Sequence, residues 1–186
     1  AEMKRAIQIK GSDTMVNLGQ AWAEEFNKIY PDVNVAVTGG GSGTGIAALI
    51  NGTCDICMAS RAMQEKEIKQ AEAKGVKPHQ EIVGLDGIAV VVNPKNPVKN
   101  LTIEQLRDIF MGTIQNWREA GGENKTIVIL SREVNSGTHL FFKEHVLRKG
   151  VTKGPEEFSP QALLMPSSQA IADEINRRRE VAEKQI

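Results

Sequence analysis

Three short loops of this 186-residue chain carry serine and threonine hydroxyls next to glycine or aspartate. Each loop follows an expected strand and precedes an expected helix; the loops are Ser12-Asp13-Thr14, Ser42-Gly43-Thr44 and Ser136-Gly137-Thr138. A helix start offers backbone N–H donors that have no partner within the helix, together with the positive end of the helix dipole. Hydroxyls add donors, and glycine lets the backbone approach a ligand closely. The pattern favours a site for a small oxyanion.

Arg132 stands four residues before the third loop and would strengthen such a site. A guanidinium group presents a planar fork of N–H donors that matches two oxygens of a tetrahedral anion. Taken singly, each loop is more often an ordinary helix cap, because serine, threonine, aspartate and glycine are common at helix starts. Three such loops and one adjacent arginine together favour anion binding.

The glycine-rich stretch at 39–49, GGGSGTGIAAL, matches neither common nucleotide signature. A P-loop has a lysine after its last glycine, whereas Gly45 is followed by Ile46. The dinucleotide fingerprint has the spacing G-x-G-x-x-G, which no register of residues 39–45 supplies. The ligand of this loop is therefore expected to be something smaller than a nucleotide.

Composition argues against several other classes of partner. The chain has 23 basic and 23 acidic side chains, whereas proteins that bind duplex nucleic acid usually carry a basic excess. Aromatic residues make up only 4% of the chain, which leaves few surfaces for base stacking. The longest apolar stretch, 88–92, is too short to cross a bilayer. The N-terminal residues contain no apolar leader, so we expect a cytosolic protein or a mature exported form.

Cys54 and Cys57 have the C-x-x-C spacing of redox dithiols and of half a zinc site. Zinc would need further ligands, and the three histidines, His79, His139 and His145, show no metal-ligand spacing. We interpret the two cysteines as small buried residues of a strand. A local disulfide between them stays open, and no metal or cofactor is expected.

Strands and helices are expected to alternate, which is typical of an α/β fold with mainly parallel sheets. Apolar periodicity predicts strands at 6–10, 33–37, 55–59, 87–93 and 126–130. Apolar residues at helical spacing predict a helix that Pro31 ends; they are Met15, Leu18, Trp22, Phe26 and Ile29. A capping box of Thr102 and Gln105 and a cap at Ser167 or Ser168 predict two further helix starts. The run at 87–93, GIAVVVN, is apolar on both faces and is expected to be a central parallel strand. The proline-containing segment 93–100 is the expected linker, so we predict two α/β lobes, 1–92 and 93–186.

Five stretches resemble the periplasmic phosphate-binding proteins that feed ABC-type phosphate importers: GSDTM, GGGSGTGIAALINGTCDICMASR, DGIAVVVNPKNPV, LRDIFMGTIQNW and SREVNSGT. The resemblance runs from about residue 7 to about residue 175. It implies a two-lobed periplasmic-binding-protein-like fold whose lobes close over one inorganic phosphate. It also implies a membrane permease as partner and a periplasmic or otherwise extracytoplasmic location, with the signal peptide removed.

The resemblance also implies which residues hold the phosphate. The family's first-loop threonine falls on Thr14, with the backbone N–H of Met15 beside it, and its second-loop serine falls on Ser42. Its arginine falls on Arg132, and its Ser-Gly-Thr turn falls on Ser136, Gly137 and Thr138. Two further serines complete the expected set of hydroxyls: Ser12 in the first loop, and Ser60 directly after the strand expected at 55–59.

One departure from the family concerns the proton of phosphate. Some members place an aspartate after an Ala-Ser pair, where it accepts the proton of hydrogen phosphate; here Ala59-Ser60 is followed by Arg61. An acceptor carboxylate repels fully ionised sulfate, so it separates the two anions. The acceptor is expected elsewhere, and the candidates are Asp13, Glu133 and, in first place, Asp86. Arg61 would add a second positive clamp, pair with one of these acids, or serve only in a salt bridge.

A second departure concerns length, because relatives continue with a strand that returns to the first lobe. We therefore expect the C-terminal part of that lobe to be missing from this chain, and an incomplete sheet can invite self-association. Two other functions stay open. One is a phosphate sensor or adhesin on the same fold. The other is a serine-type hydrolase using Ser136 and His139, although the chain lacks G-x-S-x-G. The expected function is non-catalytic.

Overall fold

The computed structural model describes residues 6–184, and their contacts group into two compact units. Unit 1 comprises Ala1–Asp86 and Asn135–Thr138, and unit 2 comprises Gly87–Val134 and His139–Ile186. The predicted lobe boundary between residues 92 and 93 stays a prediction. The N-terminal stretch without an apolar leader begins with residues 1–5, which lie outside the described range, as do residues 185–186.

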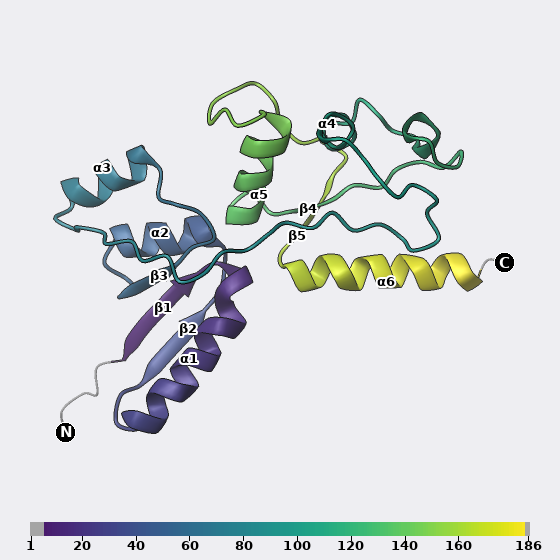
Figure 1. Cartoon of the computed structure of the whole chain (residues 1–186). Helices are drawn as coiled ribbons and strands as arrows, with labels where there is room; N and C mark the ends of the chain where they lie inside the picture. The colour runs from purple at the N-terminus through teal and green to yellow at the C-terminus, as the bar shows by residue number, and fades with distance from the viewer. Residues whose placement is uncertain (1–5, 185–186) are drawn as a thin grey trace. The chain divides into compact units, whose positions relative to one another are not determined.

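Unit 1 contains a parallel sheet in the strand order β2-β1-β3. Its elements are β1 (Ile7–Gly11), the short 3-10 helix η1 (Asp13–Met15), α1 (Val16–Ile29), β2 (Val35–Thr38), α2 (Ser42–Ile50), β3 (Ile56–Met58) and α3 (Glu65–Ala73) (Figure 1). The register pairs Ile9 with Val37 on one side and with Ile56 on the other.

The two main helices of unit 1 pack on opposite faces of this sheet. Gly19 of α1 lies against the side chain of Met58, whereas Gly45 of α2 lies against that of its neighbour Cys57. Successive strand residues point to opposite faces, so α1 and α2 cover different sides. The buried core forms on the α2 side, between α2 and α3, from Ile46, Ile50 and Ala71.

Helix α1 buries small residues rather than its large apolar ones. Gly19 and Ala23 face the sheet, and this lets the helix backbone approach closely. The residues whose helical spacing predicted this helix are exposed, namely Leu18, Trp22, Phe26 and Ile29. The helix is therefore confirmed, but much of its apolar stripe is exposed to solvent.

Unit 2 holds two parallel strands, β4 (Leu130–Arg132) and β5 (Leu163–Met165). Its helical elements are α4 (Ile103–Met111), the 3-10 turn η2 (Trp117–Ala120), α5 (Gly137–Phe142), which begins in unit 1, the π-helical turn η3 (Lys143–Leu147) and α6 (Ser168–Lys184). Ile109, Ala120 and Ile129 form its buried core. The α/β class with parallel sheets is thus confirmed in both units.

Local helix signals in the sequence are confirmed atom by atom. Thr102 Oγ1 accepts from the Gln105 backbone N–H at 3.1 Å, and Gln105 Oε1 accepts from the Thr102 N–H at 2.9 Å. This reciprocal capping box starts α4. At α6, Ser167 Oγ accepts from the Ala170 N–H at 3.0 Å.

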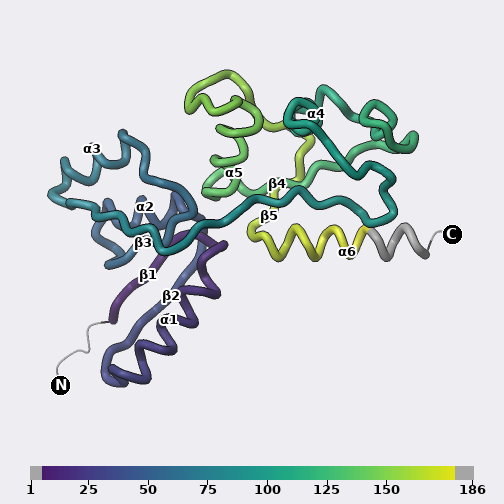
Figure 2. The backbone as a smooth tube through the Cα atoms, viewed as in Figure 1, coloured from purple at the N-terminus to yellow at the C-terminus, as the bar shows by residue number. Residues whose placement is uncertain are grey.

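The central strand predicted at 87–93 is wrong. Residues 76–102 form neither helix nor strand, Figure 2 shows no helical coil between α3 and α4, and Val91 in this segment is 56% exposed. A strand exists only through hydrogen bonds to a neighbouring strand, and none of the described strands pairs with these residues. Apolar composition alone could not supply that partner.

Within residues 6–184, no helix is long and apolar enough to span a membrane.

Candidate functional site

Three serine side chains of unit 1 meet at one point and form a hydroxyl cluster of Ser12, Ser42 and Ser60. The Ser60 hydroxyl lies 3.1 Å from Ser12 Oγ and 3.2 Å from Ser42 Oγ. The Ser60 backbone N–H also donates to Ser42 Oγ at 3.1 Å. Ser12 and Ser42 are 2% and 0% exposed. Residues far apart in the sequence thus place hydroxyls side by side in a buried position.

The sheet explains why these serines meet. Ser12 follows β1, Ser42 opens the helix after β2, and Ser60 comes two residues after the end of β3. The carboxyl ends of parallel strands share one edge of the sheet, which is where ligands bind in open α/β folds. Gly41 caps α2 with a φ of 90°, a conformation that favours glycine, and its N–H donates to the Gly11 carbonyl at 3.0 Å.

The third loop reaches the same cluster through Gly137. A Cβ atom at Gly137 would collide with the hydroxyl oxygens of Ser42 and Ser60, so a larger residue here would displace these two hydroxyls. Ser136 is buried beside it, and Thr138 Oγ1 lies 3.5 Å from Thr14 Oγ1. The structure therefore brings together residues of all three predicted loops and Ser60.

Asn135 connects the third loop to the second, and sequence reasoning missed it. Its side-chain amide donates to the Gly40 carbonyl at 2.8 Å, and its backbone carbonyl accepts from the Gly43 N–H at 3.0 Å. An asparagine directly before Ser-Gly-Thr was the available signal, because its amide can donate and accept at a loop. Asn135 holds the two glycine-containing loops in register.

Two residues of the first loop make contacts within unit 1. The Met15 N–H, expected to face the anion, donates to the Ser12 carbonyl at 3.1 Å. Asp13 Oδ1, a candidate proton acceptor, accepts from the Gly40 N–H at 2.9 Å. Both contacts fix the loop, and the roles of these residues toward a ligand stay predictions.

Arg61 forms a two-point ion pair with Glu67 of α3. Its Nη1 and Nη2 atoms each lie 2.8 Å from one Glu67 carboxylate oxygen, and the two side chains are only 12% and 14% exposed. Burial by itself would raise the pKa of Glu67, but hydrogen bonds from Arg61 and from the Gln64 N–H outweigh it and hold the pKa below its ordinary value. Arg61 therefore serves in a salt bridge, one of the three roles expected for it. Its partner, Glu67, is not among the acids Asp13, Asp86 and Glu133 that were candidates for the proton acceptor.

Arg132 ends β4 in unit 2 and is buried. Its Nη1 donates to Ser168 Oγ at 3.2 Å, and its Nη2 donates to the Pro166 carbonyl at 3.0 Å. These contacts hold the guanidinium at the start of α6. Neither Ser168 nor Pro166 was predicted from the sequence as a partner of Arg132. Its role as a ligand residue stays a prediction.

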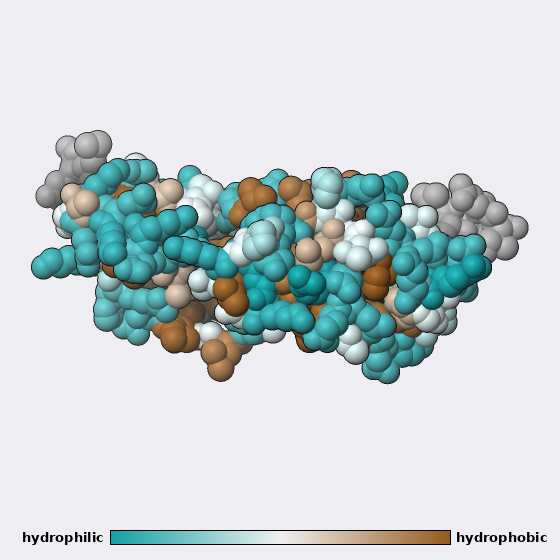
Figure 3. Space-filling view, turned by 90° about the horizontal axis from the view of Figure 1, so that it is seen from above, coloured by the Kyte–Doolittle hydropathy of each residue, from teal (hydrophilic) through white to brown (hydrophobic). Residues whose placement is uncertain are grey.

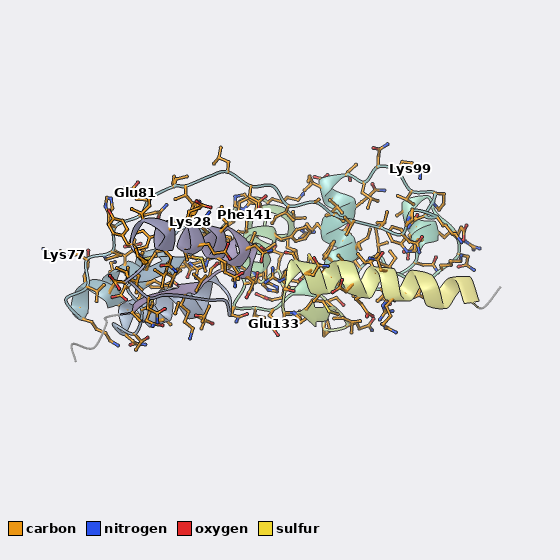
Figure 4. The ribbon with its side chains drawn as sticks, turned by 90° about the horizontal axis from the view of Figure 1, so that it is seen from below. Lys28, Lys77, Glu81, Lys99, Glu133 and Phe141 are labelled. Carbon is orange, nitrogen blue, oxygen red and sulfur yellow. The ribbon has the colours of Figure 1, made fainter. Side chains whose placement is uncertain are left out.

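The other candidate acids are exposed. Asp86 closes the first segment of unit 1 within a stretch that has no regular secondary structure. Glu133 follows β4, and its side chain lies on the surface (Figure 4). Its backbone N–H donates to the Met165 carbonyl at 3.2 Å. Which acid would accept a phosphate proton stays open.

The side chain of His139 is buried and held by a hydrogen bond and a ring contact. Its Nδ1 lies 2.8 Å from the Arg132 carbonyl, and its ring centroid lies 4.3 Å from that of Phe158. Burial lowers the pKa of His139, although the bond to the Arg132 carbonyl opposes this effect. The ring therefore favours its neutral form, with the Nδ1 proton donated to the backbone, and this nitrogen is not available to receive a proton.

The C-x-x-C cysteines are free thiols. Burial, followed by the neighbouring Cys54 thiol, raises the pKa of Cys57 to about 11. A thiol with a raised pKa is a poor nucleophile at neutral pH. The two residues thus fit the interpretation of small side chains in and beside a strand. Among the described residues, no group of three or more acidic, histidine or cysteine side chains is suited to a metal ion.

A family model and individual known proteins are similar in sequence to this chain. A family model described as a PBP superfamily domain matches residues 1–181. The phosphate-binding protein PstS of Pseudomonas aeruginosa is 34% identical over 180 residues, which cover 90% of this chain and 54% of that protein. The Bacillus subtilis protein of the same name is 37% identical over 142 residues, covering 76% of this chain and 46% of that protein. The chain thus spans about half the length of these relatives.

Solved structures agree. A putative phosphate ABC transporter substrate-binding protein from Clostridium perfringens, solved with bound phosphate, has a TM-score of 0.78 at 34% identity and covers 92% of this chain and 66% of that one. An ABC-type phosphate transport receptor from Vibrio cholerae has a TM-score of 0.70 at 36% identity, with coverage of 91% and 66%. The family resemblance expected from the sequence is confirmed: the chain belongs to the PBP superfamily.

Proposed function

We propose that this chain binds inorganic phosphate without transforming it, as part of a protein that delivers phosphate to an ABC importer. The observation that carries the proposal is the hydroxyl cluster of Ser12, Ser42 and Ser60 with Gly137 packed against it. A cluster of hydroxyls beside a helix start offers many donors and little bulk, which suits a small tetrahedral anion.

The hydroxyl cluster can respond to an anion by simple rotation. Each serine hydroxyl has one proton, and the Ser60 oxygen lies within hydrogen-bond distance of the Ser12 and Ser42 oxygens. A phosphate oxygen is a stronger acceptor than another hydroxyl, because hydrogen bonds to charged groups are stronger. The proposed ligand set consists of Ser12, Thr14, Met15, Ser42, Ser60, Ser136, Gly137 and Thr138, with Arg132 supplying charge and Asp86 accepting the phosphate proton.

The names of relatives support the same choice of ligand. The Pseudomonas and Bacillus relatives are named phosphate-binding proteins, and the Clostridium structure is described with bound phosphate. From this we also propose a membrane permease as partner, an extracytoplasmic location, and two lobes divided near residue 92. A sensor or adhesin would use the same site. The names of the relatives do not favour the hydrolase alternative, because these proteins are named for binding phosphate.

Calorimetric titration with phosphate, sulfate and arsenate tests the proposal directly. We expect heat of binding when phosphate is added. In a separate assay, we expect no turnover of chromogenic esters or phosphate monoesters. The absence of heat at about millimolar phosphate, where even a weak site would be occupied, would remove the proposed function.

Arg132→Ala is expected to weaken phosphate binding by about 2–5 kcal/mol, because truncating a charged partner in a buried site costs that much. Arg118→Ala, at an exposed arginine of η2, is the matched control and should leave the affinity unchanged. Circular dichroism checks that both variants fold. Wild-type affinity in a folded Arg132→Ala protein would show that the charge comes from elsewhere.

A further inference from the structure

The partly buried ion pair of Arg61 and Glu67 lies next to the hydroxyl cluster in the sequence and raises the question of its role there. Arg61 directly follows Ser60, the residue whose hydroxyl lies between those of Ser12 and Ser42. The guanidinium does not add a free positive charge, since both of its Nη atoms contact the Glu67 carboxylate. Nη1 additionally donates to the Ala62 carbonyl at 2.9 Å.

Glu67 is anchored as firmly as its partner. Its Oε2 accepts from the Gln64 N–H at 2.7 Å, which completes the capping box at the start of α3. The same carboxylate therefore fastens residue 61 on one side and the first turn of a helix on the other. We call this arrangement of Arg61, Glu67 and the Gln64 N–H the clasp.

The clasp fixes the short loop that carries Ser60. Residues 59–64 form neither helix nor strand, so their backbone is held by contacts rather than by a ladder. One end of the loop is attached to the hydroxyl cluster through the Ser60 N–H and hydroxyl, and the other end is attached to α3 through the clasp. A partly buried two-point ion pair resists displacement because breaking it leaves two partly desolvated charges without their partner.

We propose that Glu67 is a positioning residue of the anion site: by holding Arg61 it fixes Ser60 in the hydroxyl cluster and keeps the arginine charge away from the ligand. The proposal rests on the proposed function for its ligand, and on the recorded contacts for its geometry. It assigns to Arg61 a role in placing a neighbour rather than in contacting the anion.

Glu67→Gln tests this role, because it keeps the side-chain shape and removes the charge. Glu65→Gln is the matched control: Glu65 lies on the same helix and pairs with Lys69, but both side chains are largely exposed, at 81% and 70%. We expect phosphate affinity to fall roughly tenfold in Glu67→Gln, within the range of coupling energies between contacting residues. We expect no change in Glu65→Gln, because exposed pairs contribute little.

A double variant separates positioning from general stability. If Glu67 acts through Ser60, Glu67→Gln should lower phosphate affinity in the wild-type background and have little further effect in a Ser60→Ala background. A purely structural role would lower affinity equally in both backgrounds. Equal losses, or an affinity in Glu67→Gln that matches or exceeds wild type, would overturn the proposal; higher affinity would mean that the released Arg61 binds the anion itself.

Amide hydrogen exchange provides a readout that needs no phosphate. The Ser60 N–H donates to Ser42 Oγ, so its exchange should become about tenfold faster or more in Glu67→Gln and stay unchanged in Glu65→Gln. Unchanged exchange of this amide in Glu67→Gln would sink the positioning role. Failure of the wild-type protein to bind phosphate would instead sink the proposed function, and the exchange result would still decide between the two roles of Glu67.

Discussion

At the scale of single residues, the hydroxyl cluster depends on a glycine as much as on its serines. Gly137 carries no side chain, and this lets the third loop approach the oxygens of Ser42 and Ser60. A serine hydroxyl can redirect its proton toward a ligand by turning about its C–O bond, whereas the backbone around it cannot adapt in this way. The space left at residue 137 therefore limits the shape of the site more than the identity of any one donor.

Gly137→Ala is expected to weaken phosphate binding by at least about tenfold, because the added Cβ would overlap two donor oxygens and overpacking displaces neighbours. Calorimetry measures the affinity. Gly84→Ala is the control, since a Cβ there meets nothing within 4 Å. Equal affinities in the two variants would mean that the third loop does not limit the site.

Ser60 could be predicted as a site residue from the sequence, whereas the role of Glu67 could not. Ser60 was predicted because it follows a short expected strand, and strand ends gather at one sheet edge. The Arg61–Glu67 pair was not predicted, because nothing in the sequence distinguishes Glu67 from the other acids of its polar helix. The same holds for Asn135, whose contacts with Gly40 and Gly43 span more than ninety residues of chain.

At the scale of elements, His139 joins a helix to a strand. It lies on α5, and its Nδ1 is 2.8 Å from the carbonyl of Arg132, the last residue of β4. Phe158 packs against the ring, with the two ring centroids 4.3 Å apart. The histidine thus fixes the direction in which the chain leaves β4, which is the strand that carries the proposed charged ligand residue.

The stability of unit 2 should fall on acidification because the pKa of His139 is lowered, first by burial. Protonation then favours the unfolded chain, so the histidine's contribution is fully present above the ordinary pKa of about 6.5 and is lost as pH falls toward the folded pKa. Urea unfolding at about pH 7.5 and about pH 5 measures it. His139→Gln should show a smaller loss on acidification; an equal loss would assign the effect to other groups.

Elements with local signals were predicted well, and elements that need distant partners were not. The capping box of α4 lies within four residues and could be identified from Thr102 and Gln105 alone. The strand expected at 87–93 had the right composition, but a strand needs another strand beside it. Helix α1 was predicted from its apolar spacing, yet it buries Gly19 and Ala23, because the sheet it packs on requires close approach.

At the scale of the whole molecule, apolar surface remains exposed in each unit. Trp22 and Ile29 of α1 are exposed in unit 1, and Val90 and Val91 are exposed in unit 2. Brown apolar residues interrupt the hydrophilic surface seen in Figure 3. Extended β-branched residues without a strand partner are a known route to association between chains.

We predict that the chain self-associates with rising concentration and that Val91→Lys reduces the association, because a charge in an exposed extended segment opposes its pairing with another chain. Light scattering behind size exclusion measures the mass. Gln80→Lys adds the same charge at an exposed polar position of the same extended stretch and should not alter the mass. A strictly monomeric wild type across the concentration range would refute the prediction.

The sequence by itself determined the α/β class, the hydroxyl-bearing loops and the helix caps, because each of these depends on neighbouring residues and on the period of the apolar pattern. Only the tertiary structure decided that Ser60 lies between Ser12 and Ser42, that Gly137 touches both partners, and that Arg61 is held by Glu67. These are contacts between segments far apart in the chain. They follow from the parallel order of the strands and from packing, which no local pattern specifies.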